Sequence, residues 1–166
     1  SKGFSNMPIF TVQKHASSTL HYDFRLEIDH VLKSWVLPKG PTLDTHLKRL
    51  AIATNDHSLE CSNFEGIIHD GEYGAGKIII WDKGELQNET YDGEKLIAIE
   101  KAYKKGKIIF SLKGKKLNGK FTLLKTNKNK NWLLLKYNDY YAKNNYDITK
   151  EMPKSIYSGK LIEDIE

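Results

Sequence analysis

The sequence predicts a mainly β protein, a compact antiparallel β-barrel with one or two short helices. Short apolar runs bounded by Gly, Asn, Asp or Pro recur along the chain, as is typical of strands. Turn signals join neighbouring runs, and hairpins that follow one another favour a closed or nearly closed barrel. The 166 residues, 39% of them hydrophobic, are enough for one domain with a substantial core.

Eight of these runs are expected to form strands. They span residues 10–15, 22–28, 31–37, 49–54, 77–82, 107–113, 120–125 and 131–137. Asp29 and His30 separate the second run from the third, in the place where Asp-Gly is usual in a two-residue hairpin turn. Asn118-Gly119, in the segment LNGK, is an Asn-Gly signal and predicts another hairpin turn.

One helix is expected within residues 93–106. Leu96, Ile99 and Tyr103 line one face of this segment, and Gly106 can cap its end.

The glycine-rich segment FEGIIHDGEYGAGK, residues 64–77, lacks the GK[ST] ending of a phosphate-binding loop, and no helix pattern follows it. Its glycines are therefore expected to set a tight turn and a bulge that lead into the next strand. A second short turn is expected in residues 43–50.

We expect residues 1–9 to be an N-terminal extension, residues 10–145 to form the barrel domain, and residues 146–166, which lack strong periodicity, to be an appendage or linker. No apolar run approaches the ~20 residues that span a bilayer, and the start lacks the layout of a signal peptide. The single cysteine, Cys61, has no partner for an internal disulfide, which suits a reducing compartment. These features predict an intracellular protein without membrane contact.

The net charge of +5 is unevenly placed, because residues 101–136 hold twelve lysines and no Asp or Glu. Such a segment attracts polyanions and favours a phosphate backbone as partner, although a lysine-rich face that only keeps the domain soluble is the alternative. Among 26 basic residues, only Arg25 and Arg49 are arginine. This bias towards lysine indicates that both positions need a planar guanidinium, which binds phosphate through two parallel hydrogen bonds.

The strand at residues 22–28 carries polar side chains on one face. Since strand side chains alternate, the apolar positions face the core, whereas His21, Asp23 and Arg25 share the other face. A solvated face with a local ion pair is one explanation. The His-x-Asp spacing also puts two metal ligands about 6 to 7 Å apart at Cα, close enough to converge on one Mn²⁺ or Zn²⁺ ion, with His15 as a third ligand. Three protein ligands leave open positions for a phosphate oxygen or water.

Several motifs together resemble one family, the 3′-phosphoesterase domain of bacterial ligase D and its stand-alone archaeal and bacterial relatives. The match runs from about Phe10 to Ala142 and rests on QKH, LHYDFRLE, VLKSW, PKGP, the Asp-His at 56–57, FEG, GEYGAG and NWLLLK. The resemblance implies a β-barrel with a manganese-dependent site that heals DNA 3′ ends. Such enzymes remove a 3′-terminal ribonucleoside from a primer strand and then the remaining 3′-phosphate, which leaves a 3′-OH for a ligase.

Carried over by position, the resemblance implies a set of catalytic residues. The implied metal ligands are His15, His21 and Asp23. The implied phosphate contacts are Arg25, Arg49 and His57, with Lys39 and Ser34 as supporting polar groups. The implied metal is Mn²⁺, with Zn²⁺ or another divalent transition metal as alternatives.

The chain departs from the family pattern at three places. NDHS replaces Glu-Asp-His-Pro, so Asn55 stands where the family has a glutamate and can neither carry a negative charge nor take a proton. Cys61 replaces a tyrosine, and His69-Asp70 replaces a Pro-x pair before GEYGAG.

The sequence thus predicts a metal-dependent DNA 3′-phosphodiesterase and 3′-phosphomonoesterase that acts on primer-template ends in break repair, in the cytoplasm at the nucleoid. The alternative is a catalytically impaired module that binds DNA ends and has lost turnover through Asn55. The tail segment SIYSGKLIED resembles the junction between this domain and a ligase domain, so a DNA ligase, fused or separate, is the expected partner.

Overall fold

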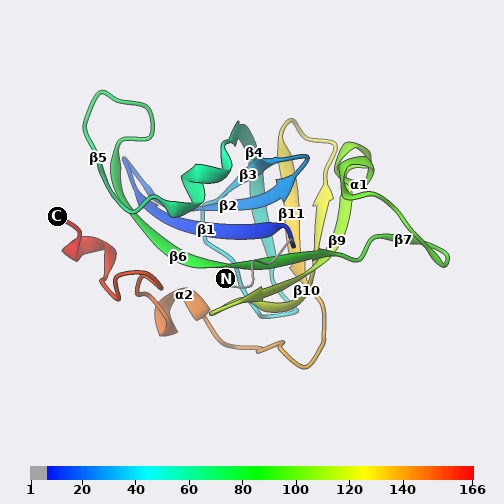
Figure 1. The fold of residues 1–166 in the computed structure, drawn as a ribbon. Coiled ribbons are helices and arrows are strands. Elements are labelled where there is room, and N and C mark those ends of the chain that lie inside the picture. The colour runs from blue at the N-terminus through cyan, green and yellow to red at the C-terminus, as the bar shows by residue number, and fades with distance from the viewer. Residues whose placement is uncertain (1–6) are drawn as a thin grey trace.

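The structure is a computed structural model that describes residues 7–166, and the first six residues of the predicted N-terminal extension lie outside the described part. Eight antiparallel strands close into a barrel (Figure 1). These strands are β1 (Ile9–Ala16), β2 (Leu20–Ile28), β3 (Val31–Leu37), β4 (Lys48–His57), β6 (Gly76–Asn88), β9 (Lys107–Gly114), β10 (Asn118–Lys125) and β11 (Asn131–Lys136). Their spatial order is β1-β2-β3-β4-β11-β10-β9-β6, and β6 pairs with β1 to complete the ring. The predicted fold class is confirmed, and every expected strand belongs to the barrel.

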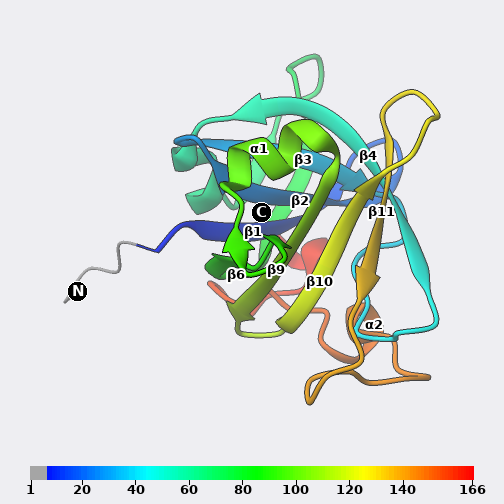
Figure 2. The same ribbon diagram turned by 90° about the vertical axis from the view of Figure 1, so that its right-hand side faces the viewer.

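Short elements complete the chain. They are the 3₁₀ helices η1 (Leu59–Asn63) and η2 (Ile162–Asp164), the helices α1 (Ile99–Lys105) and α2 (Ile148–Glu151), and the strands β5 (Gly66–Ile68), β7 (Tyr91–Asp92) and β8 (Lys95–Leu96). Figure 2 looks towards α1 and the strands β9, β10 and β11. Within residues 7–166, no helix is both long and apolar enough to cross a bilayer.

Large apolar side chains fill the barrel. The largest of the fully buried side chains are Trp35, Trp81, Phe10, Phe24, Phe110 and Phe121. On β2 the four alternate residues from Tyr22 to Ile28 are all at most 5% exposed, so the predicted core face is confirmed. The opposite face of β2 is thereby left free for polar groups.

The β2–β3 hairpin forms as predicted. Asp29 and His30 adopt positive φ angles of 54° and 65°, and Ile28 pairs with Val31. A two-residue turn of this kind needs both central residues in the left-handed region, which Asp tolerates better than most side chains.

The second predicted hairpin turn is wrong. Asn118 and Gly119 lie within β10, and the chain turns earlier, around residues 115–117. The reason is Asp82, a fully buried carboxylate of β6. Its two oxygens accept the backbone N–H groups of all three turn residues, and this stabilises the turn at that point.

The predicted helix is shorter than expected. Ile99 and Tyr103 lie in α1, and Gly106 ends it in the left-handed conformation with a φ of 83°. Leu96, expected on the same helical face, instead pairs with Tyr91 in the β7–β8 hairpin. The chain therefore turns back once more before the helix begins.

The glycine-rich segment contains the expected turn. Gly71, Gly74 and Gly76 adopt positive φ angles, and β6 begins at Gly76. The bulge lies farther along β6 than predicted, because Trp81 is the extra residue where the β1–β6 register shifts. The predicted turn in residues 43–50 forms at residues 45–46.

The C-terminal tail, drawn orange to red in Figure 1, packs against the barrel. Trp81 Nε1 donates to the carbonyl of Met152 at 2.8 Å, and Ile156 N donates to the carbonyl of Ile80 at 2.9 Å. Ile162 and Ile165 are both buried in the core cluster. The segment expected as an appendage or linker therefore contributes apolar side chains to the folded domain.

Two of the twelve clustered lysines are buried. Lys116 Nζ lies 4.4 Å from the centroid of the Trp81 ring, and burial lowers the pKa of Lys116 to about 8. Lys136 forms an ion pair with Asp139 at 2.6 Å and is 4% exposed. These two side chains are engaged within the fold and are not available to a partner.

Candidate metal and phosphate site

The candidate site is built on the faces of β1 and β2 that point away from the core. In the register of the two strands, His15 pairs with His21 and Gln13 pairs with Asp23. Val12 faces the core, so its neighbour Gln13 and the alternate residue His15 project to the opposite face. The hairpin therefore brings His15 beside the His-x-Asp pair of β2.

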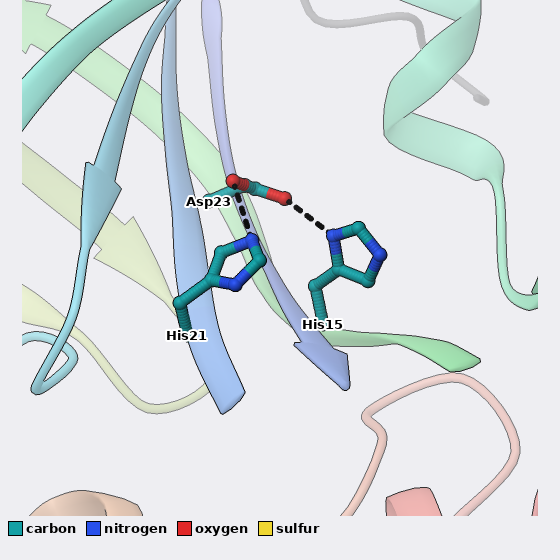
Figure 3. A group of neighbouring side chains, drawn as sticks. All are labelled: His15, His21 and Asp23. Carbon is teal, nitrogen blue, oxygen red and sulfur yellow. Dashed lines mark ion pairs between the residues drawn. The ribbon is translucent and has the colours of Figure 1, made fainter. Parts of the chain in front are cut away.

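The three predicted metal ligands converge (Figure 3). His15 Nδ1 lies 3.5 Å from Asp23 Oδ2, and His21 Nε2 lies 3.4 Å from Asp23 Oδ1. One ligand atom of each residue lies within 4.8 Å of the others, and no second group of this kind is found within residues 7–166. Two imidazole nitrogens and a carboxylate oxygen suit a divalent first-row metal such as Mn²⁺ or Zn²⁺.

Backbone carbonyls determine which imidazole nitrogen carries the proton. His15 Nε2 lies 2.9 Å from the carbonyl oxygen of Ala75, and His21 Nδ1 lies 3.2 Å from that of Thr19. Carbonyl oxygens only accept, so we assign the protons to these two nitrogens. In neutral rings, the nitrogens that face Asp23 then carry lone pairs, which repel its carboxylate unless a cation or a further proton lies among them. The three residues therefore fit a bound metal ion.

The electrostatics of the site favour a positive charge. The hydrogen bond to Asp23 outweighs burial and raises the pKa of His15. Burial raises the pKa of Asp23, but hydrogen bonds from both histidines and the charge of Arg25 outweigh it and hold that pKa well below its usual range. Asp23 is thus ionised at neutral pH, as a metal ligand must be.

Arg25 connects the metal ligands to the rest of the site. It is 5% exposed; its Nε donates to Gln13 Oε1 at 3.1 Å, and its Nη1 donates to Ser34 Oγ and His57 Nδ1, both at 2.9 Å. Its Nη2 lies 3.5 Å from Asp23 Oδ2. Because Nε and both protons of Nη1 are used within the protein, Nη2 is the nitrogen left for a ligand. The two parallel hydrogen bonds to phosphate stay a prediction.

His57, the last residue of β4, has two neighbours at its Nδ1. Arg25 Nη1 and the carbonyl oxygen of Asn55 each lie 2.9 Å away. A guanidinium can only donate, so Nδ1 accepts and we assign the ring proton to Nε2. Burial and the positive charge of Arg25 lower the pKa of His57. The neutral ring therefore offers an N–H donor at Nε2.

These groups line one cleft of about 580 Å³, which the three metal ligands share with Arg25 and His57. A family model described as the DNA ligase D 3′-phosphoesterase domain matches residues 13–125, which include all of them. The chain belongs to this family. The expected resemblance is confirmed.

Three relatives of the family extend the match. The chain is 44% identical over 158 residues to the multifunctional non-homologous end joining protein LigD of Pseudomonas aeruginosa, which covers 92% of this chain and 18% of that protein. It is 46% identical over 124 residues to the corresponding DNA repair protein LigD of Mycobacterium tuberculosis, with coverages of 75% and 15%. For LigD of Mycolicibacterium smegmatis the identity is 42% over 131 residues, with coverages of 78% and 17%. The chain thus spans less than a fifth of the length of these LigD relatives.

Of the phosphate-contacting residues implied for the ligase D family, three come together. Arg25 Nη1 meets Ser34 Oγ and His57 Nδ1, and Ser34 Oγ also lies 3.4 Å from His57 Nδ1. These contacts join β2, β3 and β4 across the sheet.

Lys39 and Arg49 do not line the cleft. Lys39 is exposed in the loop after β3. Arg49 shares its side of β4 with the core residue Ala51, whereas Thr54, on the other side, lines the cleft. The phosphate contacts of these two residues stay a prediction.

The residues that depart from the ligase D family pattern differ in whether they line the cleft. Cys61 lines the cleft, with its Sγ 3.7 Å from Gln13 Oε1. The exposed side chain of Asn55 does not line it, and only the backbone carbonyl of this residue approaches His57. His69 and Asp70 are exposed.

Sequence reasoning missed Gln13 and Tyr73. Gln13 is 2% exposed, accepts a hydrogen bond from Arg25 and donates to the carbonyls of Cys61 and Phe64, so it ties η1 to the site. The signal was available, because Gln13 and His15 alternate on the same face of one predicted strand. Tyr73 lines the cleft from the glycine-rich segment, and its ring centroid lies 6.4 Å from that of His57.

Proposed function

We propose that this domain is a metal-dependent 3′-phosphoesterase that heals DNA ends. As a phosphodiesterase it removes a 3′-terminal ribonucleoside, and as a phosphomonoesterase it removes the remaining 3′-phosphate and leaves a 3′-OH. The observation that carries the proposal is the single cleft in which three metal ligands adjoin the Arg25–His57 pair. A phosphate in this cleft meets a cation site, a guanidinium nitrogen and an imidazole N–H together.

Each group of the site has a separate role in this proposal. His15, His21 and Asp23 hold the metal, for which the family suggests Mn²⁺; when bound, such an ion acts as a Lewis acid and lowers the pKa of a bound water. Arg25 Nη2 stabilises the negative charge that grows on the phosphoryl oxygens.

His57 Nε2–H donates a hydrogen bond to the phosphate. The lowered pKa of His57 supports this role over proton donation, because the imidazolium that would donate a proton is disfavoured beside Arg25.

We infer that duplex DNA lies along a basic end of the barrel. We use this name for six exposed lysines: Lys104, Lys105, Lys107, Lys125, Lys128 and Lys130. They are close together because Lys125 N donates to the carbonyl of Gly106 at 2.7 Å, and Leu124 pairs with Lys107. Ala53 N donates to the carbonyl of Lys130 at 2.8 Å, next to the cleft residue Thr54, so the basic end adjoins the cleft.

The names of the relatives indicate non-homologous end joining and DNA repair. We therefore propose primer-template 3′ ends as substrates, a DNA ligase, fused or separate, as partner, and the cytoplasm, at the nucleoid, as location. No membrane partner is proposed. A non-catalytic module that binds DNA ends is the rival proposal, and the position of Asn55 outside the cleft weakens its basis.

The test is an incubation of the protein with a primer-template that ends in one ribonucleotide, with Mn²⁺, Zn²⁺ or EDTA. We expect successive products with a 3′-phosphate and a 3′-OH in the presence of metal, and none in EDTA. DNA binding without either product at any metal concentration would support the rival module.

Matched histidine variants connect the activity to the site. His21→Ala should lose both products and bound metal after dialysis. His46→Ala, which changes an imidazole that is 76% exposed and absent from the cleft lining, should retain both. Equal metal content in the two variants would refute the metal site.

A further inference from the structure

The lining of the cleft has a polar part and an apolar part. The polar part contains the metal ligands, Arg25 and His57, whereas Phe64, Ile68 and Tyr73 contribute apolar surface. Phe64 is 37% exposed and Tyr73 is 74% exposed. Large apolar side chains that are exposed at the edge of a polar site indicate contact with a ligand that is itself partly apolar.

The backbone that carries Tyr73 is held against the barrel. Its loop is closed by backbone hydrogen bonds from Glu72 N to His69 O and from Ala75 N to Glu72 O, both 3.2 Å. The carbonyl of Ala75 also accepts from His15 Nε2. Any side chain at Gly76 would collide with the backbone of β1, so this end of the loop lies directly on the barrel. The contact that orients the metal ligand His15 therefore also holds the backbone two residues from Tyr73, whose ring centroid lies 6.4 Å from that of His57.

The order of the strands indicates which part of the DNA reaches Tyr73. The basic end lies beyond β4, next to β11, whereas the Tyr73 loop joins β5 to β6 on the other side of β1. The phosphate-contacting residues of the site, on β2, β3 and β4, lie between them along this path. In the other direction round the barrel, β6 pairs with β9 only through residues 84–88, at the end of β6 away from Tyr73. If the duplex rests on the basic end, the strand that passes the phosphate position continues towards Tyr73. The nucleoside beyond the scissile phosphate is then the one next to the ring.

We propose that Tyr73 is the stacking platform for the terminal nucleoside, and hence a specificity-determining residue of the phosphodiesterase step. This inference rests on the proposed function. In that step a water oxygen bonds to phosphorus, the bond from phosphorus to the nucleoside 5′ oxygen breaks, and the nucleoside leaves with a proton on that oxygen. The phosphomonoesterase step has no nucleoside beyond the phosphate, so the ring has no partner in it.

The test compares two primer-templates that share one primer sequence, one ended by a ribonucleotide and one by a 3′-phosphate. Tyr73→Ala should raise KM for the ribonucleotide end by about 5- to 150-fold, the range for loss of one stacked base, and shift the ratio of kcat/KM between the two substrates by the same factor. Tyr73→Trp should restore the ratio, because indole also stacks. Tyr140→Ala, a matched change of a tyrosine that is 93% exposed and absent from the cleft lining, should leave the ratio unchanged.

Two outcomes would overturn the inference. An equal loss on both substrates would assign Tyr73 to the upstream strand, and no loss on either would show that the ring does not contact DNA. Binding in EDTA separates this inference from the proposed function, since it needs no turnover. If the wild type cleaves neither substrate, the proposed function fails. The inference then still requires that the wild type bind the primer with a terminal ribonucleotide more tightly than the primer with a 3′-phosphate, and that Tyr73→Ala abolish this difference in affinity.

Discussion

Arg25→Lys tests whether the site depends on the shape of the guanidinium or only on its charge. In the structure the guanidinium donates three hydrogen bonds, to Gln13, Ser34 and His57, and lies 3.5 Å from Asp23. A lysine ammonium keeps the charge but is a single compact group, so it replaces one of these hydrogen bonds and leaves two unmade.

The cost follows from these hydrogen bonds. Hydrogen bonds to charged groups contribute about 1.5 kcal/mol or more each, so loss of two should lower the free energy of unfolding by about 3 kcal/mol. The effect on turnover should be larger. Without Arg25 Nη1, the ring proton of His57 can move from Nε2 to Nδ1, where it faces the Asn55 carbonyl, and Nε2 then has no proton to donate. Loss of one preorganised donor at the reacting phosphate costs about 100-fold or more in rate.

The assay is the single-turnover rate on a primer-template with a 3′-ribonucleotide, together with urea unfolding and DNA affinity. We expect a rate at least about 100-fold lower and little change in affinity, because the lysines of the basic end supply the backbone contacts. Leu26→Ala is the matched control. It affects a fully buried side chain on the other face of β2, costs about 2–5 kcal/mol, and should retain turnover at temperatures where it is folded. An Arg25→Lys rate equal to that of the wild type would refute the reasoning.

Four further predictions rest on the same structure. In EDTA, the difference in free energy of unfolding between the wild type and His15→Gln should be largest between pH 3.8 and 6.5. The Asp23 contribution is lost as pH falls below 3.8 through the lowered pKa of Asp23. The His15 contribution is lost as pH rises above 6.5 through the raised pKa of His15. A difference in thermal unfolding that grows with rising pH would contradict this. Changing the six lysines of the basic end to Gln should reduce the slope of log affinity against log salt by about 0.9 for each DNA phosphate that is no longer neutralised. The control changes Lys113 and Lys115, which lie at the other end of the β9–β10 hairpin, and should leave the slope unaltered. Removal of residues 161–166, which include two buried isoleucines, should lower the free energy of unfolding by about 3 kcal/mol in urea titrations, and an unchanged value would show that the tail does not stabilise the barrel. Asn55→Glu should change either step by no more than about fivefold, the effect of one exposed charge, and a larger change would show that this side chain reaches the substrate.

The parts of the fold that depend on near neighbours in the chain were predictable from the sequence. Alternation along residues 22–28 separates the core side chains of β2 from His21, Asp23 and Arg25, because successive side chains of any strand point to opposite faces. His15 could be joined to them because only a short β1–β2 turn intervenes, and a hairpin places its two strands side by side. The metal ligands were predictable for this reason.

Contacts between distant segments required the tertiary structure. The turn around residues 115–117 is stabilised by Asp82, and this side chain overrides the Asn-Gly signal at residues 118–119. The tail appears featureless in sequence, yet Ile162 and Ile165 belong to the core cluster, and η2 contacts β6 and β1.

The site shows the same division between local and distant contacts. The proton positions on His15 and His57 depend on Ala75 and Arg25, which are 60 and 32 residues away. Arg49 has the residue type that suits phosphate, but the alternation of β4 turns it to the side opposite Thr54. A sequence pattern reports which side of its own strand a residue occupies. Only the closure of the barrel determines which strands adjoin, and hence which of these side chains meet.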